Sequence, residues 1–95
     1  MGKRFIYFWD PTPGGNVEHV ADGDVSQDEF EQVLERGFTD RAPSRTEAGR
    51  WVARDYTDGL RALVVVFELD DLPEENAWGI TPVTSYPPRK PPAKG

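Results

Sequence analysis

Leu63-Val-Val-Val-Phe67 is an unbroken apolar run in the second half of the chain, and it predicts a central strand buried on both faces. Before it lies Arg50-Trp-Val-Ala-Arg-Asp-Tyr56, a stretch that also predicts a strand. Thr57-Asp-Gly59 between them is typical of a turn. We therefore expect a β-hairpin with strands at residues 50–56 and 60–69.

The residues upstream of this hairpin predict a helix. Ser26-Gln-Asp-Glu29 has the pattern of a capping box, in which the Ser hydroxyl and the Glu carboxylate satisfy each other's backbone amides. Phe30, Val33 and Leu34 then recur at the spacing of one buried helical face. Gly37 predicts the end of this helix in a left-handed conformation.

The remaining segments complete an α+β pattern. We expect a first strand at 3–9, a short helix at 16–22 capped by Asn16, loops at 39–49 and 70–76, and a last strand at 77–86. Pro82 marks that last strand as an edge strand or as the site of a bulge, because proline has no N–H for the ladder. The expected order is β-α-α-β-β-β, with two helices packed on a mainly antiparallel sheet. Residues 1–86 form a single domain in this interpretation, and residues 87–95 a Pro-rich, basic, disordered tail.

Composition narrows the function classes. The chain has 95 residues, no cysteine and a net charge of −6. Without cysteine there is no disulfide or thiolate metal site, so we expect a cytoplasmic protein. No segment has the length of apolar sequence that a signal peptide or a membrane span requires. The negative charge disfavours general nucleic-acid binding, which relies on Lys and Arg.

The charges lie in blocks. Residues 18–35 hold seven acids and no Lys or Arg, whereas residues 36–61 hold six arginines. Such a division is either a bipolar surface that steers a partner or two solvated faces that pair with each other. The basic block leaves room for weak local contact with RNA.

Several residues are candidates for chemistry. His19, the sole histidine, is either a general acid or base or a capping and packing residue. Arg50, Arg54 and Tyr56 share one face of their strand by its period of two, and with Arg61 they form either a phosphate platform or a solvent face paired with acids such as Glu68. One histidine among scattered carboxylates lacks the spacing of metal ligands, so we expect no metal and no cofactor.

The order of these motifs resembles that of the BrnT-like ribonuclease toxins, a branch of the RelE-like toxin superfamily. The likeness covers residues 5–86 and rests on order and spacing. Its parts are Trp9-Asp10, Asn16-x-x-His19, Val25-Ser26 before an acidic helix, Arg50-Trp51, Asp58-Gly59 with Arg61, the run Leu63–Phe67, and Val83-Thr84.

The resemblance implies a metal-independent endoribonuclease held inactive by an antitoxin-like protein. In that reading His19, Arg54 and Tyr86 are catalytic, while Arg50, Tyr56 and Arg61 bind RNA phosphates. This chain carries Asp22 and Asp24 where the family tends to have a basic run, and Tyr86 where it commonly has an arginine. We therefore expect a ribonuclease activity that is weak or lost.

A non-enzymatic alternative stays open at this stage. Aromatic residues make up 12% of a small chain, and the acidic block offers a second surface for contact. Both features suit a protein–protein interaction module, including a homodimer.

Overall fold

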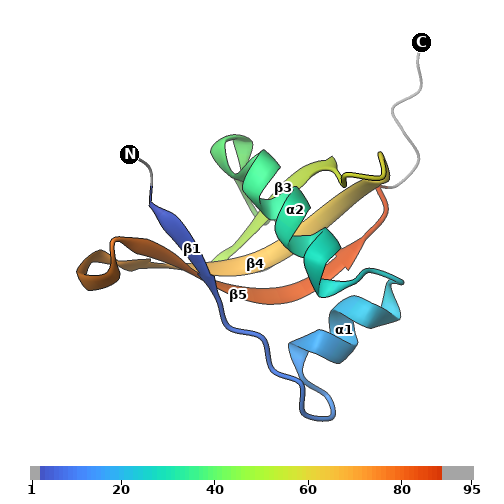
Figure 1. The fold of residues 1–95 in the computed structure, drawn as a ribbon, viewed down its shortest axis with the longest axis horizontal. Helices are drawn as coiled ribbons and strands as arrows, with labels where there is room; N and C mark the ends of the chain where they lie inside the picture. Colours follow the sequence, from blue (N-terminus) through green and yellow to red (C-terminus); the bar gives the residue numbers. More distant parts are fainter. Residues whose placement is uncertain (1–2, 89–95) are drawn as a thin grey trace.

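The computed structural model describes residues 3–88 and shows the expected α+β architecture (Figure 1). The elements follow one another as β1 (Arg4–Tyr7), α1 (Asn16–Asp22), α2 (Gln27–Gly37), β2 (Ala42–Pro43), β3 (Arg50–Tyr56), β4 (Ala62–Leu72) and β5 (Ala77–Tyr86). Short 3-10 turns at Phe38–Asp40 and Pro73–Glu75 follow α2 and β4. The tail expected at 87–95 lies outside the described residues from position 89 onward.

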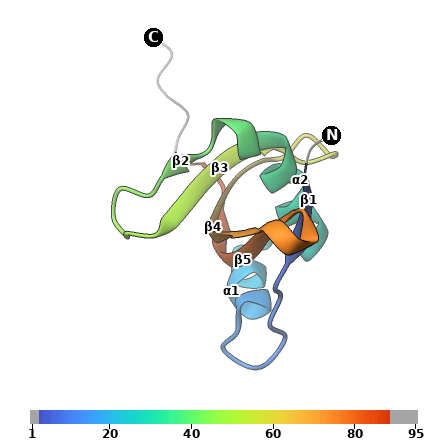
Figure 2. The same cartoon turned by 90° about the vertical axis from the view of Figure 1, so that its left-hand side faces the viewer.

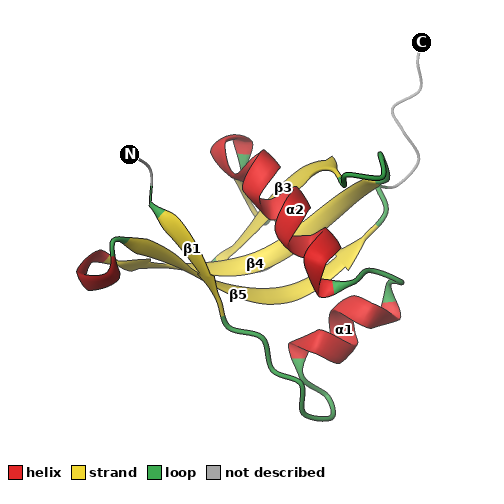
Figure 3. Cartoon of the chain, viewed as in Figure 1, coloured by secondary structure: helices red, strands yellow, loops and turns green. Residues whose placement is uncertain are grey.

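The strands form one five-stranded sheet in the order β1-β5-β4-β3-β2. Only β1 and β5 pair in parallel, so the sheet is mainly antiparallel, as expected. The apolar run falls in β4, at the centre of the sheet, and its prediction as a central strand is confirmed. Figure 3 shows the two helices lying together on one side of the strands.

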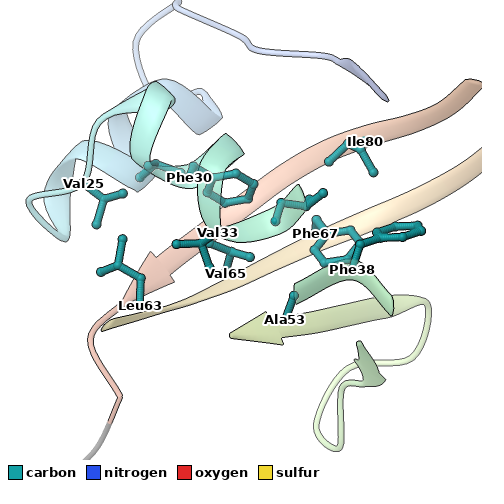
Figure 4. Packing of buried hydrophobic residues seen from close by; sticks show 11 residues of the cluster. Val25, Phe30, Val33, Phe38, Ala53, Leu63, Val65, Phe67 and Ile80 are labelled. Carbon is teal, nitrogen blue, oxygen red and sulfur yellow. The ribbon is translucent and has the colours of Figure 1, made fainter. Parts of the chain in front are cut away.

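The core lies between that side of the sheet and the helices. Phe30, Val33 and Leu34 of α2 are fully buried against Val65 and Phe67 of β4 (Figure 4). Burial of a side chain of this size stabilises the fold by roughly 1.5–3 kcal/mol. The predicted apolar face of α2 is therefore the face that joins the two layers.

The start of α2 contains the capping box that the sequence predicts. Ser26 accepts a hydrogen bond from the Glu29 amide at 3.1 Å, and the Glu29 carboxylate accepts one from the Ser26 amide at the same distance. A complete capping box of this kind satisfies two of the amides that a helix start leaves without partners.

The predicted roles of two residues at helix ends, Asn16 and Gly37, are wrong. Asn16 does not cap α1, because its side chain accepts from the amide of Asp10 and donates to the carbonyl of Phe8 instead. Gly37 is not left-handed, since its φ is −96°. A Cβ at Gly37 would lie 2.7 Å from the Arg54 carbonyl oxygen, so glycine there permits α2 to touch β3 closely.

Strand boundaries also differ from expectation. β4 begins at Ala62 rather than residue 60, because Leu60 has a φ of +65°, and it continues past residue 69 to Leu72. The predicted loop at 39–49 contains the short strand β2, and the first strand covers only Arg4–Tyr7. Pro82 lies next to a bulge, where the register shifts between Val66 and Phe67, so the bulge alternative is correct and the edge alternative is wrong.

Candidate functional site

Arg50, Arg54 and Tyr56 lie on the face of the sheet opposite the helices, whereas Arg61 pairs with Glu29 of α2. Strand pairing places Arg54 of β3, Val64 of β4 and Tyr86 of β5 in one row across three strands. Ala53 and Ser85, their neighbours in sequence, are buried on the other face. We call the side that carries Arg54 and Tyr86, opposite the helices, the open face. Figure 2 shows it from the side, with α2 on one side of the strands and β2 and β3 extending away from it.

A groove of about 600 Å³ crosses the open face. Val52 and Arg54 of β3 line it, Tyr86 bounds it, and the segment from Asp40 through β2 to Thr46 forms its far wall. That segment is held in place because the amide of Ser44 donates to the carbonyl of Arg50 at 2.8 Å. The groove thus joins two residues that are far apart in sequence, Arg54 and Tyr86.

The polar groups of this groove favour an anion. Arg45 and Arg54 supply two guanidinium groups, and Ser44, Thr46 and Tyr86 supply hydroxyls. Asp40 is the one carboxylate among the residues that line it. Guanidinium forks and hydroxyl donors are the groups that bind phosphate oxygens in proteins.

The three arginines of the prediction differ in their partners. Arg50 pairs with Glu47 and, through Nε at 3.4 Å, with Glu68. Arg61 forms ion pairs with two acids: its Nη1 lies 3.2 Å from Oε1 of Glu29, and its Nη2 lies 3.9 Å from Oδ2 of Asp24.

Arg54 is exposed, and its guanidinium has no hydrogen bond or ion pair within residues 3–88. Of the three arginines, Arg54 alone has a guanidinium that no carboxylate of residues 3–88 pairs with, so this group can pair with a ligand.

Tyr56 lies on the same face, opposite Ala62 of β4. Its side chain is 52% exposed, and it lines a second hollow of about 320 Å³ together with Arg54, Ala62 and Pro88. Arg54 therefore stands between the larger groove and this smaller hollow.

His19 lies apart from this group. It is exposed on α1, and it lines neither the groove nor the hollow. Within the described part of the chain its imidazole makes no hydrogen bond, including to Asp22, the residue that the spacing offered as its partner. The structure brings Arg54, Tyr56 and Tyr86 together, and leaves His19 and Arg61 outside.

Sequence reasoning missed the far wall of the groove. Arg45, Ser44 and Thr46 fall in the segment read as a polar loop, where no periodic pattern assigns a direction to side chains. The sequence does show a cluster of arginines at 36–61, which includes Arg45. The position of Arg45 beside the groove, however, depends on the pairing of β2 with β3.

Two titratable groups outside the groove have altered pKa values. Burial raises the pKa of Tyr7, and its hydrogen bond to Glu35 raises it further. Asp10 has a lowered pKa because the hydroxyl and the amide of Thr12 donate to its carboxylate. Neither group lines the groove, so they bear on stability rather than on ligand binding.

Across residues 3–88, no cluster of three or more His, Asp or Glu side chains has the geometry to hold a metal ion. In the same range, no helix combines the length and the apolar character needed to cross a membrane.

Comparison of the sequence with protein-family models and with curated proteins, and of the fold with solved structures, gave no match.

Proposed function

We propose that this chain is a BrnT-like toxin-fold protein that binds single-stranded RNA in the groove of the open face, and that its ribonuclease activity is weak or lost. The observation that carries the proposal is the position of Arg54 beside Tyr86, where it is exposed and has no acidic partner among residues 3–88. A phosphodiester fits a site with two guanidinium groups and several hydroxyls.

The groove also suits an unpaired strand better than a duplex. Tyr86 and Tyr56 are 43% and 52% exposed, and their rings are available for a base to stack on. Stacking on aromatic rings requires bases that are not paired in a helix. Arg54 shares the groove with Tyr86 and the hollow with Tyr56, where it would contact the phosphate between two stacked bases.

Proton transfer is the weak element of this site. Cleavage of RNA without a metal needs a group that removes the proton of the 2′-hydroxyl and one that protonates the leaving oxygen. The imidazole of His19 can in principle accept and donate a proton, but His19 does not line the groove. Tyr86 can donate a hydrogen bond but adds no positive charge to the transition state. We therefore expect binding to exceed cleavage.

Fluorescence anisotropy with a labelled single-stranded RNA tests the binding step. Arg54→Gln is expected to weaken binding about tenfold and to reduce the salt slope by about one between 50 and 200 mM salt, because one phosphate contact is lost. Arg50→Gln is the matched control, since Arg50 already pairs with Glu47 and Glu68. Equal affinity of the Arg54→Gln variant and the wild type would overturn the proposal.

Cleavage is measured separately, on the same RNA, for the wild type, His19→Ala and Tyr86→Phe. We expect slow or undetectable cleavage by the wild type and no change for His19→Ala. Efficient cleavage by the wild type would contradict the weak-or-lost activity proposed above, and a loss of that activity in His19→Ala would show that His19 is catalytic, as the resemblance implies.

A protein–protein interaction module is the second candidate function. Among residues 3–88 the exposed large apolar side chains are Phe8, Tyr56, Leu60 and Tyr86. Tyr56 and Tyr86 lie on the open face, and Leu60 lies in the turn at its end. Such gathering on one face is typical of an interaction surface, for an antitoxin-like protein or a second copy of the chain. Light scattering after size exclusion tests the homodimer. A strictly monomeric chain would exclude it, while RNA binding is measured independently.

A further inference from the structure

Leu60 combines two unfavourable features in one residue. Its side chain is 79% exposed, and its backbone has a φ of +65°. Within the described range the other non-glycine residues with positive φ are Asp24 and Asn76, types that adopt this conformation more readily. An asparagine at position 60 would relieve both costs, so the leucine side chain itself calls for a reason.

The turn that carries Leu60 is firmly held. The amide of Leu60 donates to the carbonyl of Thr57 at 2.8 Å, and the amide of Thr57 donates to Arg61 at 2.9 Å. From α2, Arg36 donates to the carbonyl of Tyr56, and Gln32 accepts from the amide of Asp58. Leu60 is thus presented to solvent by a turn with little freedom to move, which reduces the entropy lost on binding.

The strands that enter and leave this turn line the smaller hollow. Its walls are largely apolar and include Tyr56, Ala62, Leu63 and Pro88, with Arg54 and Asp55 as the charged residues, and its volume is about 320 Å³. A hollow of this size accommodates one or two large side chains. The apolar character of Ala62 in the hollow, and of Leu60 in the turn two residues before it, fits a protein side chain better than it fits an RNA phosphate.

Asp55 also lines the hollow, and its carboxylate accepts a hydrogen bond from the amide of Tyr56 at 2.7 Å. Arg54 supplies the positive charge of the hollow. Its guanidinium lines the wall and has no acidic partner within residues 3–88. A ligand that covers this cation needs a negative group to replace the lost water. Aromatic and arginine side chains together are also the residues most enriched at protein interfaces.

We propose that Tyr56, Leu60, Ala62 and Pro88 form a docking site for a protein segment that carries apolar anchor residues next to a carboxylate, which pairs with Arg54. This goes beyond RNA binding and does not depend on it, because Leu60, Ala62 and Pro88 do not line the larger groove. The site shares Arg54 with that groove, and Tyr56 with the stacked base proposed above, so an occupant here competes with RNA for both residues.

A random peptide library displayed on phage and selected against the full chain tests the proposal. Selected peptides are expected to combine Leu, Phe or Trp with Asp or Glu. Synthetic copies should bind Leu60→Asn and Arg54→Gln at least tenfold more weakly than the wild type. Leu60→Asn should retain or gain thermal stability, so its loss of binding cannot come from unfolding.

Two control variants separate this site from the groove. Arg45→Gln removes a cation of the groove alone, and Phe8→Ser removes an exposed aromatic ring that lines neither the groove nor the hollow. Both should keep full affinity for the peptides, while Arg45→Gln weakens RNA binding. The proposal is overturned if no peptides are enriched, if they lack acidic residues, or if Leu60→Asn binds them as the wild type does. A loss of RNA affinity in Leu60→Asn with peptide affinity unchanged would reassign the surface to nucleic acid.

Discussion

The hydroxyl of Tyr7 in β1 donates a 2.8 Å hydrogen bond to the carboxylate of Glu35 in α2. One helical turn earlier, the indole of Trp9 donates to Glu31 at 2.9 Å. These two bonds connect β1 and the residues that follow it to α2, in addition to the pairing of β1 with β5 and the ion pair of Arg4 with Glu75. The edge of the sheet therefore depends on side chains of the acidic block, which the sequence offered mainly as a solvated or steering surface.

Tyr7→Phe is expected to lower the free energy of unfolding by about 1–2 kcal/mol, because a hydrogen bond to a charged acceptor is lost. Urea unfolding measures the change. Tyr56→Phe is the matched control, since the Tyr56 hydroxyl has no partner within residues 3–88 and its ring is half-exposed. Equal losses in the two variants would mean that the Tyr7 bond contributes nothing specific.

Tyr7 also predicts a pH dependence. Burial, with the bond to Glu35, raises its pKa in the folded state above the unfolded value. The neutral phenol is therefore favoured by folding, and this stabilisation is complete below the unfolded pKa of about 10 and falls as the pH rises beyond it. Between neutral pH and strongly alkaline pH, the wild type should lose more stability than Tyr7→Phe. Parallel stability curves for the two proteins would contradict this assignment.

Gly37→Ala is expected to destabilise the fold by about 1–3 kcal/mol, in spite of the better helix propensity of alanine. The new Cβ would lie 2.7 Å from the carbonyl oxygen of Arg54 and 3.1 Å from its amide nitrogen, so α2 and β3 must separate. Because the displaced residue is Arg54, RNA affinity should fall as well. Thermal unfolding and anisotropy measure the two effects.

Gly59→Ala is the control for that experiment. The nearest atom to a Cβ at Gly59 is the Thr57 hydroxyl oxygen at 3.8 Å, which is an ordinary contact. We expect little change in stability or in RNA affinity. If Gly37→Ala is equally neutral, the close approach of α2 to β3 does not constrain the site.

These contacts show why parts of the fold could be predicted and others could not. The Ser26 capping box, the buried face of α2 and the central valine run are local patterns, and the structure contains all three. Gly37 was correctly singled out but for the wrong reason, since its role is a contact with β3 rather than a left-handed turn. The sequence likewise predicts Asn16 as a helix cap, but its side chain accepts from the amide of Asp10 and donates to the carbonyl of Phe8.

The candidate site depended even more on contacts distant in sequence. The period of two placed Arg50, Arg54 and Tyr56 on one face, and the register confirms it. It could not show that Arg50 pairs with Glu47 and Glu68, while Arg54 has no ion pair in the described part of the chain. The groove itself requires the pairing of β2 with β3 and of β4 with β5, which no local pattern specified.

Arg36 provides a final test, because it connects α2 to the turn that presents Leu60. Its guanidinium donates to the Tyr56 carbonyl at 2.7 Å and pairs with Asp58. Arg36→Ala should cost only about 1 kcal/mol overall, since the group is partly exposed. Locally the effect should be larger. Amide hydrogen exchange at Asp58 and Leu60 should quicken, and peptides selected on the wild type should bind more weakly, although Arg36 does not line the hollow. Arg4→Ala, which removes an exposed pair with Glu75 at 3.8 Å, should change neither measurement. Unchanged exchange at Leu60 in Arg36→Ala would show that the turn is rigid through its own backbone bonds alone.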